Sequence, residues 1–167
     1  MIRLARPDEI ALLPQIESAA DERFRRVGLQ LVFDMPPHSV NMLRDAWRRG
    51  LLWVATSPAN RPVGFALLKV TSGVAWLEQL TVLDLWQGRS LGAALIDRAQ
   101  EAAGALGYRS LYLTTYRNVP WNAPFYRRRG FVEVARGDLT PAMRLVVMTE
   151  VRFGHPIWQR AVMVRSR

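Results

Sequence analysis

The sequence contains no cysteine, and that absence removes several kinds of chemistry at once. Disulfide bonds, thiolate metal sites and a cysteine nucleophile are all excluded. Histidine is nearly as scarce, because only His38 and His155 occur and they stand far apart in the chain. A catalytic zinc site needs more nitrogen ligands than these two, or a set of carboxylates that no pattern here indicates. We therefore expect no metal.

Long apolar runs are missing as well. No segment approaches the roughly 18 consecutive apolar residues that a membrane helix requires. Residues 1–7 lack the apolar region of a signal peptide and have the pattern of a short strand. These absences predict a cytoplasmic protein without a membrane partner.

Lysine occurs once, at Lys69, so the other basic residues are arginines, and the net charge is +9. A basic surface favours anionic partners, of which coenzyme A is one and nucleic acid is another. The arginines are spread along the chain in small groups, and no helix-turn-helix or RNA-binding pattern is present. We therefore expect no nucleic-acid partner. A salt-dependent shift on DNA would revive that possibility.

What the sequence does contain is enough apolar material for a core. Half of the 167 residues are hydrophobic, so the chain is globular, and its length predicts one domain over residues 1–167. Apolar periodicity predicts helices over residues 8–27, 39–49 and 90–106, and a short helix with Pro124 in its first turn. Gly28 should end the first helix, and Ser39 should cap the second. Alternating or β-branched runs predict strands over residues 2–6, 51–56, 63–71, 74–82, 110–115, 131–135, 145–150 and 157–164.

Short links join the three strands between residues 51 and 82, which predicts an antiparallel meander. The strand over 110–115 follows a helix, so it should lie parallel to a neighbour after a right-handed crossover.

The stretch from Trp76 to Ala93 organises the rest of the chain. It has the pattern of a strand, a short loop and a helix N-terminus that contains Gly88, Ser90 and Gly92. The first turn of a helix has unpaired N–H groups and the positive end of the dipole, and small residues let an anion approach the backbone. Ser90 is placed to cap this helix, and Arg89 adds a cation. An ordinary capped helix is the alternative to a phosphate site.

The spacing of this stretch resembles a known family. Gln87-x-x-Ser90-x-Gly92 resembles the acyl-CoA pyrophosphate loop of the GCN5-related N-acetyltransferase (GNAT) family, with Ser90 where the first glycine is usual. Residues 80–82 are similar to the strand that binds the pantetheine arm, and residues 125–131 are similar to the family's Tyr-x-x-x-Gly-Phe. The resemblance is specific over about residues 62–134. It implies an α/β (α+β) fold with a mixed, mostly antiparallel central sheet of six to seven strands and helices on both faces.

The resemblance also implies acetyl-CoA as the acyl donor and a set of residues that bind it. The family usually has an asparagine seven residues before the tyrosine, but Val119 stands there, so both neighbouring asparagines are candidates. The predicted coenzyme-binding residues are Leu80, Thr81, Val82, Gln87, Gly88, Arg89, Ser90, Leu91, Gly92, Ala93, Asn118, Asn122 and Tyr126.

Acetyl transfer to an amine requires removal of the amine proton, and the leaving thiolate benefits from a proton. Many members of the family carry a glutamate on the strand before the loop, so the resemblance makes Glu78 the candidate base. Because side chains alternate along a strand with a period of two, we expect Glu78 to point to the same face as Leu80 and Val82. Tyr126 is the candidate acid, since a phenol with a pKa near ~10 donates better than it accepts at neutral pH. The alternatives are an acid on an exposed sheet surface and a packed aromatic ring.

Trp76, Trp86 and Trp121 could line an acceptor pocket or lie in the core. The leading hypothesis is an N-acetyltransferase that moves an acetyl group from acetyl-CoA to a primary amine of a small molecule, peptide or protein, by direct attack in a ternary complex. We expect a monomer or a homodimer. The alternative is a catalytically silent coenzyme A-binding module of the same fold.

Overall fold

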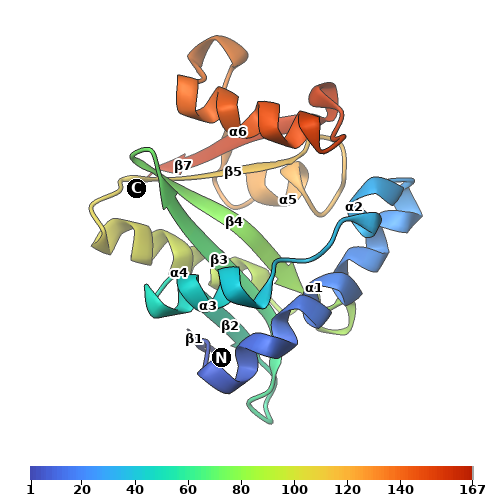
Figure 1. Ribbon diagram of the computed structural model, residues 1–167, viewed down its shortest axis with the longest axis vertical. Coiled ribbons are helices and arrows are strands. Elements are labelled where there is room, and N and C mark those ends of the chain that lie inside the picture. Colours follow the sequence, from blue (N-terminus) through green and yellow to red (C-terminus); the bar gives the residue numbers. More distant parts are fainter. Residues whose placement is uncertain (167) are drawn as a thin grey trace.

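The computed structural model describes residues 1–166, and these form a seven-stranded mixed sheet (Figure 1). The strand order is β1-β2-β3-β4-β5-β7-β6. All neighbouring strands are antiparallel except β4 and β5, which are parallel. The predicted sheet, meander and parallel neighbour are therefore confirmed. The strands are β1 (Ile2–Leu4), β2 (Leu52–Thr56), β3 (Pro62–Thr71), β4 (Val74–Val82), β5 (Ser110–Tyr116), β6 (Val132–Glu133) and β7 (Arg160–Ser166).

Helices cover both faces of the sheet (Figure 1). On one face, α4 buries Leu95 and Ile96 against the strands. On the other, α1 and α3 bury Leu13 and Leu43 against β2 and β3, and α6 packs Met143 against Trp76 of β4 and Val162 of β7. The α-helices are α1 (Leu13–Asp21), α2 (Gln30–Asp34), α3 (Val40–Arg48), α4 (Leu91–Ala105), α5 (Ala123–Arg127) and α6 (Pro141–Arg152). Short 3-10 segments occupy η1 (Pro7–Leu12), η2 (Glu22–Val27), η3 (Asp84–Trp86), η4 (Arg136–Asp138) and η5 (Ile157–Gln159).

No helix within residues 1–166 combines the length and the apolar character that crossing a membrane requires.

The parallel strands β4 and β5 are joined over a short distance only. Their register runs from Ala75 opposite Leu111 to Trp76 opposite Tyr112, and beyond that point β5 continues to pair with β7. A β-bulge lies in β4 just where the pairing ends, because the register with β3 shifts from Gln79 opposite Leu67 to Leu77 opposite Leu68. A bulge bends and twists its strand. The two strands therefore separate towards the end of β4, and the site described below lies at this separation.

The bulge corrects one prediction about Glu78. Leu80 and Val82 pack into the core beneath α4, but the Glu78 carboxylate lies 3.4 Å from the ammonium of Lys69, which stands opposite Trp76. Glu78 is the extra residue of the bulge, so the period of two is interrupted there. The expectation that it shares a face with Leu80 and Val82 was wrong.

Three predictions about helices also needed correction. Residues 145–150 form part of α6 rather than a strand, because Thr140 caps the helix through Met143 N–H at 3.3 Å and Pro141 occupies its first turn. The helix expected over residues 8–27 is divided into η1, α1 and η2, although Gly28 does end it with a φ of 71°. Ser39 caps α3 as predicted, at 3.2 Å, whereas the Ser90 side chain makes no capping hydrogen bond.

Candidate active site

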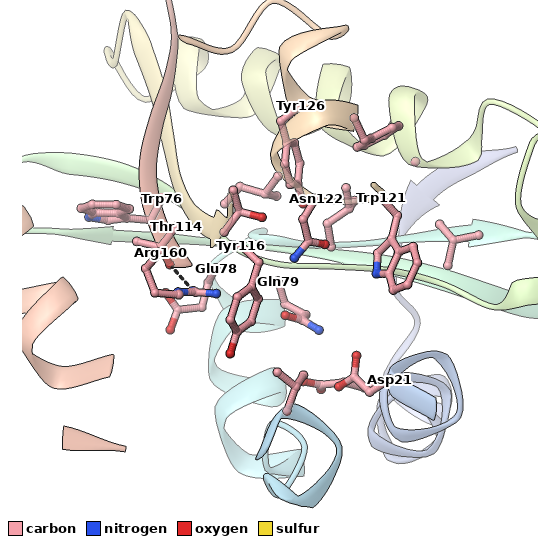
Figure 2. A pocket seen from close by; sticks show the side chains of 18 of the residues that line it. Asp21, Trp76, Glu78, Gln79, Thr114, Tyr116, Trp121, Asn122, Tyr126 and Arg160 are labelled. Carbon is pink, nitrogen blue, oxygen red and sulfur yellow. Dashed lines mark hydrogen bonds between the residues drawn. The ribbon is translucent and has the colours of Figure 1, made fainter. Parts of the chain in front are cut away.

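A cavity of about 890 Å³ opens where β4 and β5 separate (Figure 2). Its walls come from the end of β4, the loop into α4, the segment before α5, the chain from α1 to α2, and α6. Figure 2 shows Tyr126 and Asn122 pointing into the cavity from one side and Asp21 facing them from the opposite wall. Groups from segments far apart in the sequence therefore meet around one space.

Most of the residues predicted for the site line this cavity. They are Trp76, Glu78, Leu80, Val82, Trp86, Gln87, Gly88, Ser90, Leu91, Gly92, Ala93, Trp121, Asn122 and Tyr126. The other three lie elsewhere. Thr81 is buried and accepts a hydrogen bond from Gln79 Nε2 at 2.9 Å. The Arg89 guanidinium lies 4.9 Å from the Trp86 ring centre. Asn118 is exposed to solvent.

The N-terminus of α4 provides the features of an anion site. Gly88 and Ser90 both have positive φ angles, 73° and 59°, which turn the loop back so that the first turn of the helix faces the cavity. Gln87 is held in place because its Nε2 donates to the Val82 carbonyl at 3.1 Å. Arg128 and Arg129 line the same cavity and were not predicted. Unpaired N–H groups and these guanidinium groups favour a phosphate here.

A left-handed conformation suits glycine better than serine, because serine has a Cβ. Ser90 adopts it with φ at 59°. This geometry gives a physical reason for the glycine that the pyrophosphate-loop pattern usually has at this point.

Tyr126 lies in α5 with its ring edge-on to two neighbours, 5.3 Å from the Phe125 ring centre and 5.6 Å from that of Phe131. Burial raises the pKa of Tyr126 to about 12, against the opposing effect of the positive charges of Arg23 and Arg160. The phenol therefore keeps its proton at neutral pH. In this state the hydroxyl has a proton that it can donate into the cavity.

Acidic groups line the opposite wall. Glu17 is buried and accepts hydrogen bonds from the His38 N–H at 3.0 Å and from His38 Nδ1 at 2.8 Å. Burial lowers the pKa of His38, but its hydrogen bond and charge interaction with Glu17 outweigh burial and raise that pKa above its usual value. Asp21 is half-buried, and its carboxyl makes no ion pair or hydrogen bond to any described residue. Burial, assisted by the charge of Glu17, raises the pKa of Asp21 to about 7.

A second polar cluster joins β5, α6 and β7 at the cavity wall, and sequence reasoning missed it. Arg160 donates to both carboxylate oxygens of Glu150, at 2.9 and 3.0 Å, and to Thr114 Oγ1 at 3.0 Å, a contact marked in Figure 2. The Tyr116 hydroxyl lies 2.5 Å from His155 Nδ1. Burial and the charge of Arg160 lower the pKa of His155, so its ring stays neutral near pH 7. In this cluster the charges of Arg160 and Glu150 are already paired with each other.

All three candidate tryptophans of the acceptor pocket, Trp76, Trp86 and Trp121, line the cavity and also pack against the core. Trp76 is buried and lies 5.8 Å from the Tyr112 ring centre. Trp121 lies 5.7 Å from the Phe24 ring centre, and its Nε1 is buried without a hydrogen-bond partner among residues 1–166.

The raised pKa of Asp21 predicts how the free energy of unfolding changes with pH. Between its ordinary value of 3.8 and about 7, the folded protein holds a proton that the unfolded chain releases, so this group lowers stability as pH rises through that window. Asn cannot titrate. The free energy of unfolding of Asp21→Asn minus that of the wild type should therefore increase from pH 4 to pH 7 and then level off. Urea denaturation across this range measures it.

Asp45→Asn is the control, because Asp45 is exposed on α3 and outside the cavity. Its difference from the wild type should change little over the same range. A flat difference for Asp21→Asn would mean that the Asp21 carboxyl ionises as it does in water.

The chain belongs to the GNAT acetyltransferase family. The sequence model of the acetyltransferase (GNAT) domain matches residues 48–133, which is more than half of the chain and includes β4, the loop, α4 and α5.

Solved structures of low sequence identity share the fold. A GNAT-family acetyltransferase from Staphylococcus aureus is 16% identical with a TM-score of 0.74, and 99% of this chain covers 98% of that one. The PaiA N-acetyltransferase from Thermoplasma acidophilum, in complex with coenzyme A, is 16% identical with a TM-score of 0.71, over 100% of this chain and 98% of that one. N-acetylglutamate synthase from Neisseria gonorrhoeae, complexed with coenzyme A and N-acetylglutamate, is 17% identical with a TM-score of 0.72, over 99% of this chain and 34% of that one.

Proposed function

We propose that this protein is an acetyl-CoA-dependent N-acetyltransferase, with residues 1–167 acting as one domain, that transfers an acetyl group to a primary amine in a ternary complex. The observation that carries the proposal is that an anion site at a helix N-terminus and a protonated phenol open onto the same cavity as a set of carboxyl groups. The coenzyme A in the Thermoplasma and Neisseria structures supports the same assignment.

The residues present fit the coenzyme. Residues 87–93 supply backbone N–H groups for its diphosphate, and Arg128 and Arg129 add positive charge. The end of β4, from Leu80 to Val82, supplies the backbone for the pantetheine arm. Asn122 lines the cavity and Asn118 does not, so Asn122 is the asparagine that we assign to the coenzyme. When bound, acetyl-CoA supplies the acetyl group as a thioester.

The chain's own side chains then move two protons. The Glu78 carboxylate accepts the proton of the acceptor ammonium, directly or through water, so that the amine nitrogen becomes a nucleophile. Tyr126 holds a proton on Oη and donates it to the departing sulfur. Both groups line one cavity, Glu78 from the bulge of β4 and Tyr126 from α5. Glu78 therefore acts on the amine nitrogen and Tyr126 on the departing sulfur, within the space that opens where β4 separates from β5.

The test is release of free thiol from acetyl-CoA by the purified full chain with a panel of small amines, amino acids and peptides. We expect release with a subset of the panel. If coenzyme A raises the melting temperature but no amine releases thiol, the chain is a silent coenzyme-binding module instead.

The role of Glu78 is tested by its pH dependence. For Glu78→Gln, kcat/KM should lose the rise with pH that ionisation of a base produces, and the deficit should shrink at high pH, where more amine is already neutral. Glu101→Gln is the matched control, because Glu101 is exposed on α4, pairs with Arg98 and lies outside the cavity. A deficit that is constant with pH would mean that Glu78 positions the amine by charge. No deficit would assign the proton to another group.

A further inference from the structure

Arg23 is a cation of the cavity wall whose positive charge is not paired. It lies in η2, it is half-buried, and it lines the cavity. Its Nε is buried without a hydrogen-bond partner, and its guanidinium forms no ion pair within residues 1–166. Two other cations that line the cavity differ, because the partly buried Arg160 is held by Glu150 at 2.9 Å and the exposed Lys69 lies 3.4 Å from Glu78. A half-buried guanidinium without a carboxylate partner is costly, so it calls for an anion from outside the chain.

Aromatic rings hold the Arg23 guanidinium in place without satisfying its N–H groups. Its central carbon lies 5.3 Å from the Trp121 ring centre and 5.7 Å from that of Phe24. The nearby carboxylate of Asp84 pairs instead with Arg26, at 3.4 Å. A guanidinium that is fixed in this way presents a planar set of donors, the geometry that binds a carboxylate through two parallel hydrogen bonds.

Arg23 and the proposed proton donor Tyr126 line the same cavity. The positive charge of Arg23 also acts on the pKa of the Tyr126 phenol, which it lowers against the effect of burial. Asp21 stands two residues earlier on the same wall, and its unpaired carboxyl faces the cavity (Figure 2). The charges of Asp21 and Arg23 act on each other, but the two groups form no ion pair within residues 1–166. Together they therefore offer a carboxyl and a guanidinium to the ammonium and the carboxylate of one small molecule.

We propose that the acceptor is a free amino acid, with its carboxylate bound by Arg23 and its ammonium received by Asp21 before the proton is lost. This inference rests on the proposed acetyl transfer and specifies its acceptor. The lining also includes apolar side chains, among them Val32, Met35, Trp76, Leu145 and Phe153. These walls suit an amino acid with an apolar side chain.

Three matched amines test the carboxylate site in the wild-type protein. Phenylalanine, phenylalaninamide and 2-phenylethylamine share one ring and one amine, and only the first carries a carboxylate. Thiol release from acetyl-CoA should show kcat/KM for phenylalanine roughly ten- to a hundred-fold above that of the other two, the range expected for a charged hydrogen-bonded pair.

Variants assign the preference to Arg23. Arg23→Met keeps the apolar stem but removes the charge, and it should lower kcat/KM for phenylalanine by ten-fold or more beyond any loss for 2-phenylethylamine. Arg23→Lys should recover part of the preference. Asp21→Asn should weaken all three amines, because each carries the ammonium. Arg25→Met is the control, since Arg25 is exposed, lies over the Phe33 ring at 3.6 Å and is outside the cavity.

The outcomes separate this inference from the proposed function. If amines react but phenylalanine has no advantage over its amide, the amino-acid acceptor is overturned and acetyl transfer stands. If Arg23→Met lowers the affinity for coenzyme A and slows all amines equally, the anion is the coenzyme phosphate, and the inference again fails. If coenzyme A stabilises the protein but no amine reacts, both proposals fail. A cooperative thermal unfolding transition without coenzyme shows that each variant is folded.

Discussion

Replacing Gly92 by aspartate is expected to abolish the rise in melting temperature that acetyl-CoA produces in the wild-type protein. Gly92 lies in the first turn of α4 and lines the cavity, where the coenzyme diphosphate is proposed to bind. A carboxylate placed there would meet the diphosphate with charge of the same sign. A ligand that binds only the folded state raises the melting temperature, so loss of binding removes the shift.

The structure separates the effect of charge from the effect of size at this position. A Cβ at Gly92 would lie 3.4 Å from Phe125 Cζ and 4.0 Å from Val82 Cγ2, which is ordinary van der Waals contact. An acidic residue in the first turn also favours the helix dipole, so folding itself should not suffer. Gly92→Ala should therefore retain most of the shift, and Gly92→Asn, which matches aspartate in size, should retain more of it than Gly92→Asp.

Thermal unfolding at increasing acetyl-CoA concentration makes the comparison. If Gly92→Asp kept the full shift, the coenzyme would bind away from α4, and the assignment of residues 87–93 would be wrong. If all three variants lost the shift equally, side-chain bulk rather than charge would be the cause.

The parts of the site that the sequence predicts are short and local. In the loop over residues 87–93 and in the segment 125–131, the functional residues of each motif are only a few positions apart. Their spacing in the sequence is therefore enough to bring them close together in space. Fourteen of the predicted site residues, among them Trp76, Glu78 and Tyr126, line one cavity. Their chemical roles remain predictions.

The rest depends on contacts between distant segments. The bulge that turns Glu78 towards Lys69 is a property of the pairing between β3 and β4, and no local pattern in β4 indicates it. Glu150 meets Arg160 because α6 packs across β7, but the apolar run near residue 145 has the composition of a strand. Asp21 lines the cavity as the last residue of α1, and the predicted long helix changes into a 3-10 segment just after it.

Removing the hydroxyl of Tyr126 should lower kcat on the order of ten- to a hundred-fold or more, the usual range for a general acid. Tyr126→Phe keeps the ring, which packs edge-on against Phe125 and Phe131, so the fold and the cavity wall should be preserved. The affinity for coenzyme A should be nearly unchanged, because the proton is needed only when the thiolate leaves. Single-turnover rates and coenzyme titrations measure the two quantities separately.

The pH dependence gives this prediction a second readout. Burial raises the pKa of Tyr126 to about 12, so the wild-type rate should show no fall from ionisation of this phenol between neutral pH and about pH 10. The deficit of Tyr126→Phe should accordingly stay constant over that range, unlike the deficit of Glu78→Gln, which should shrink as pH rises.

Tyr108→Phe is the control, since Tyr108 packs against the core and lies outside the cavity. Full activity in Tyr126→Phe would leave the tyrosine a packing role and require water or another donor to protonate the sulfur. The wild-type rate could instead fall with an apparent pKa near ~10 while the rate of the variant does not. The phenol would then be a proton donor that ionises as it does in water, and the cavity would not raise its pKa.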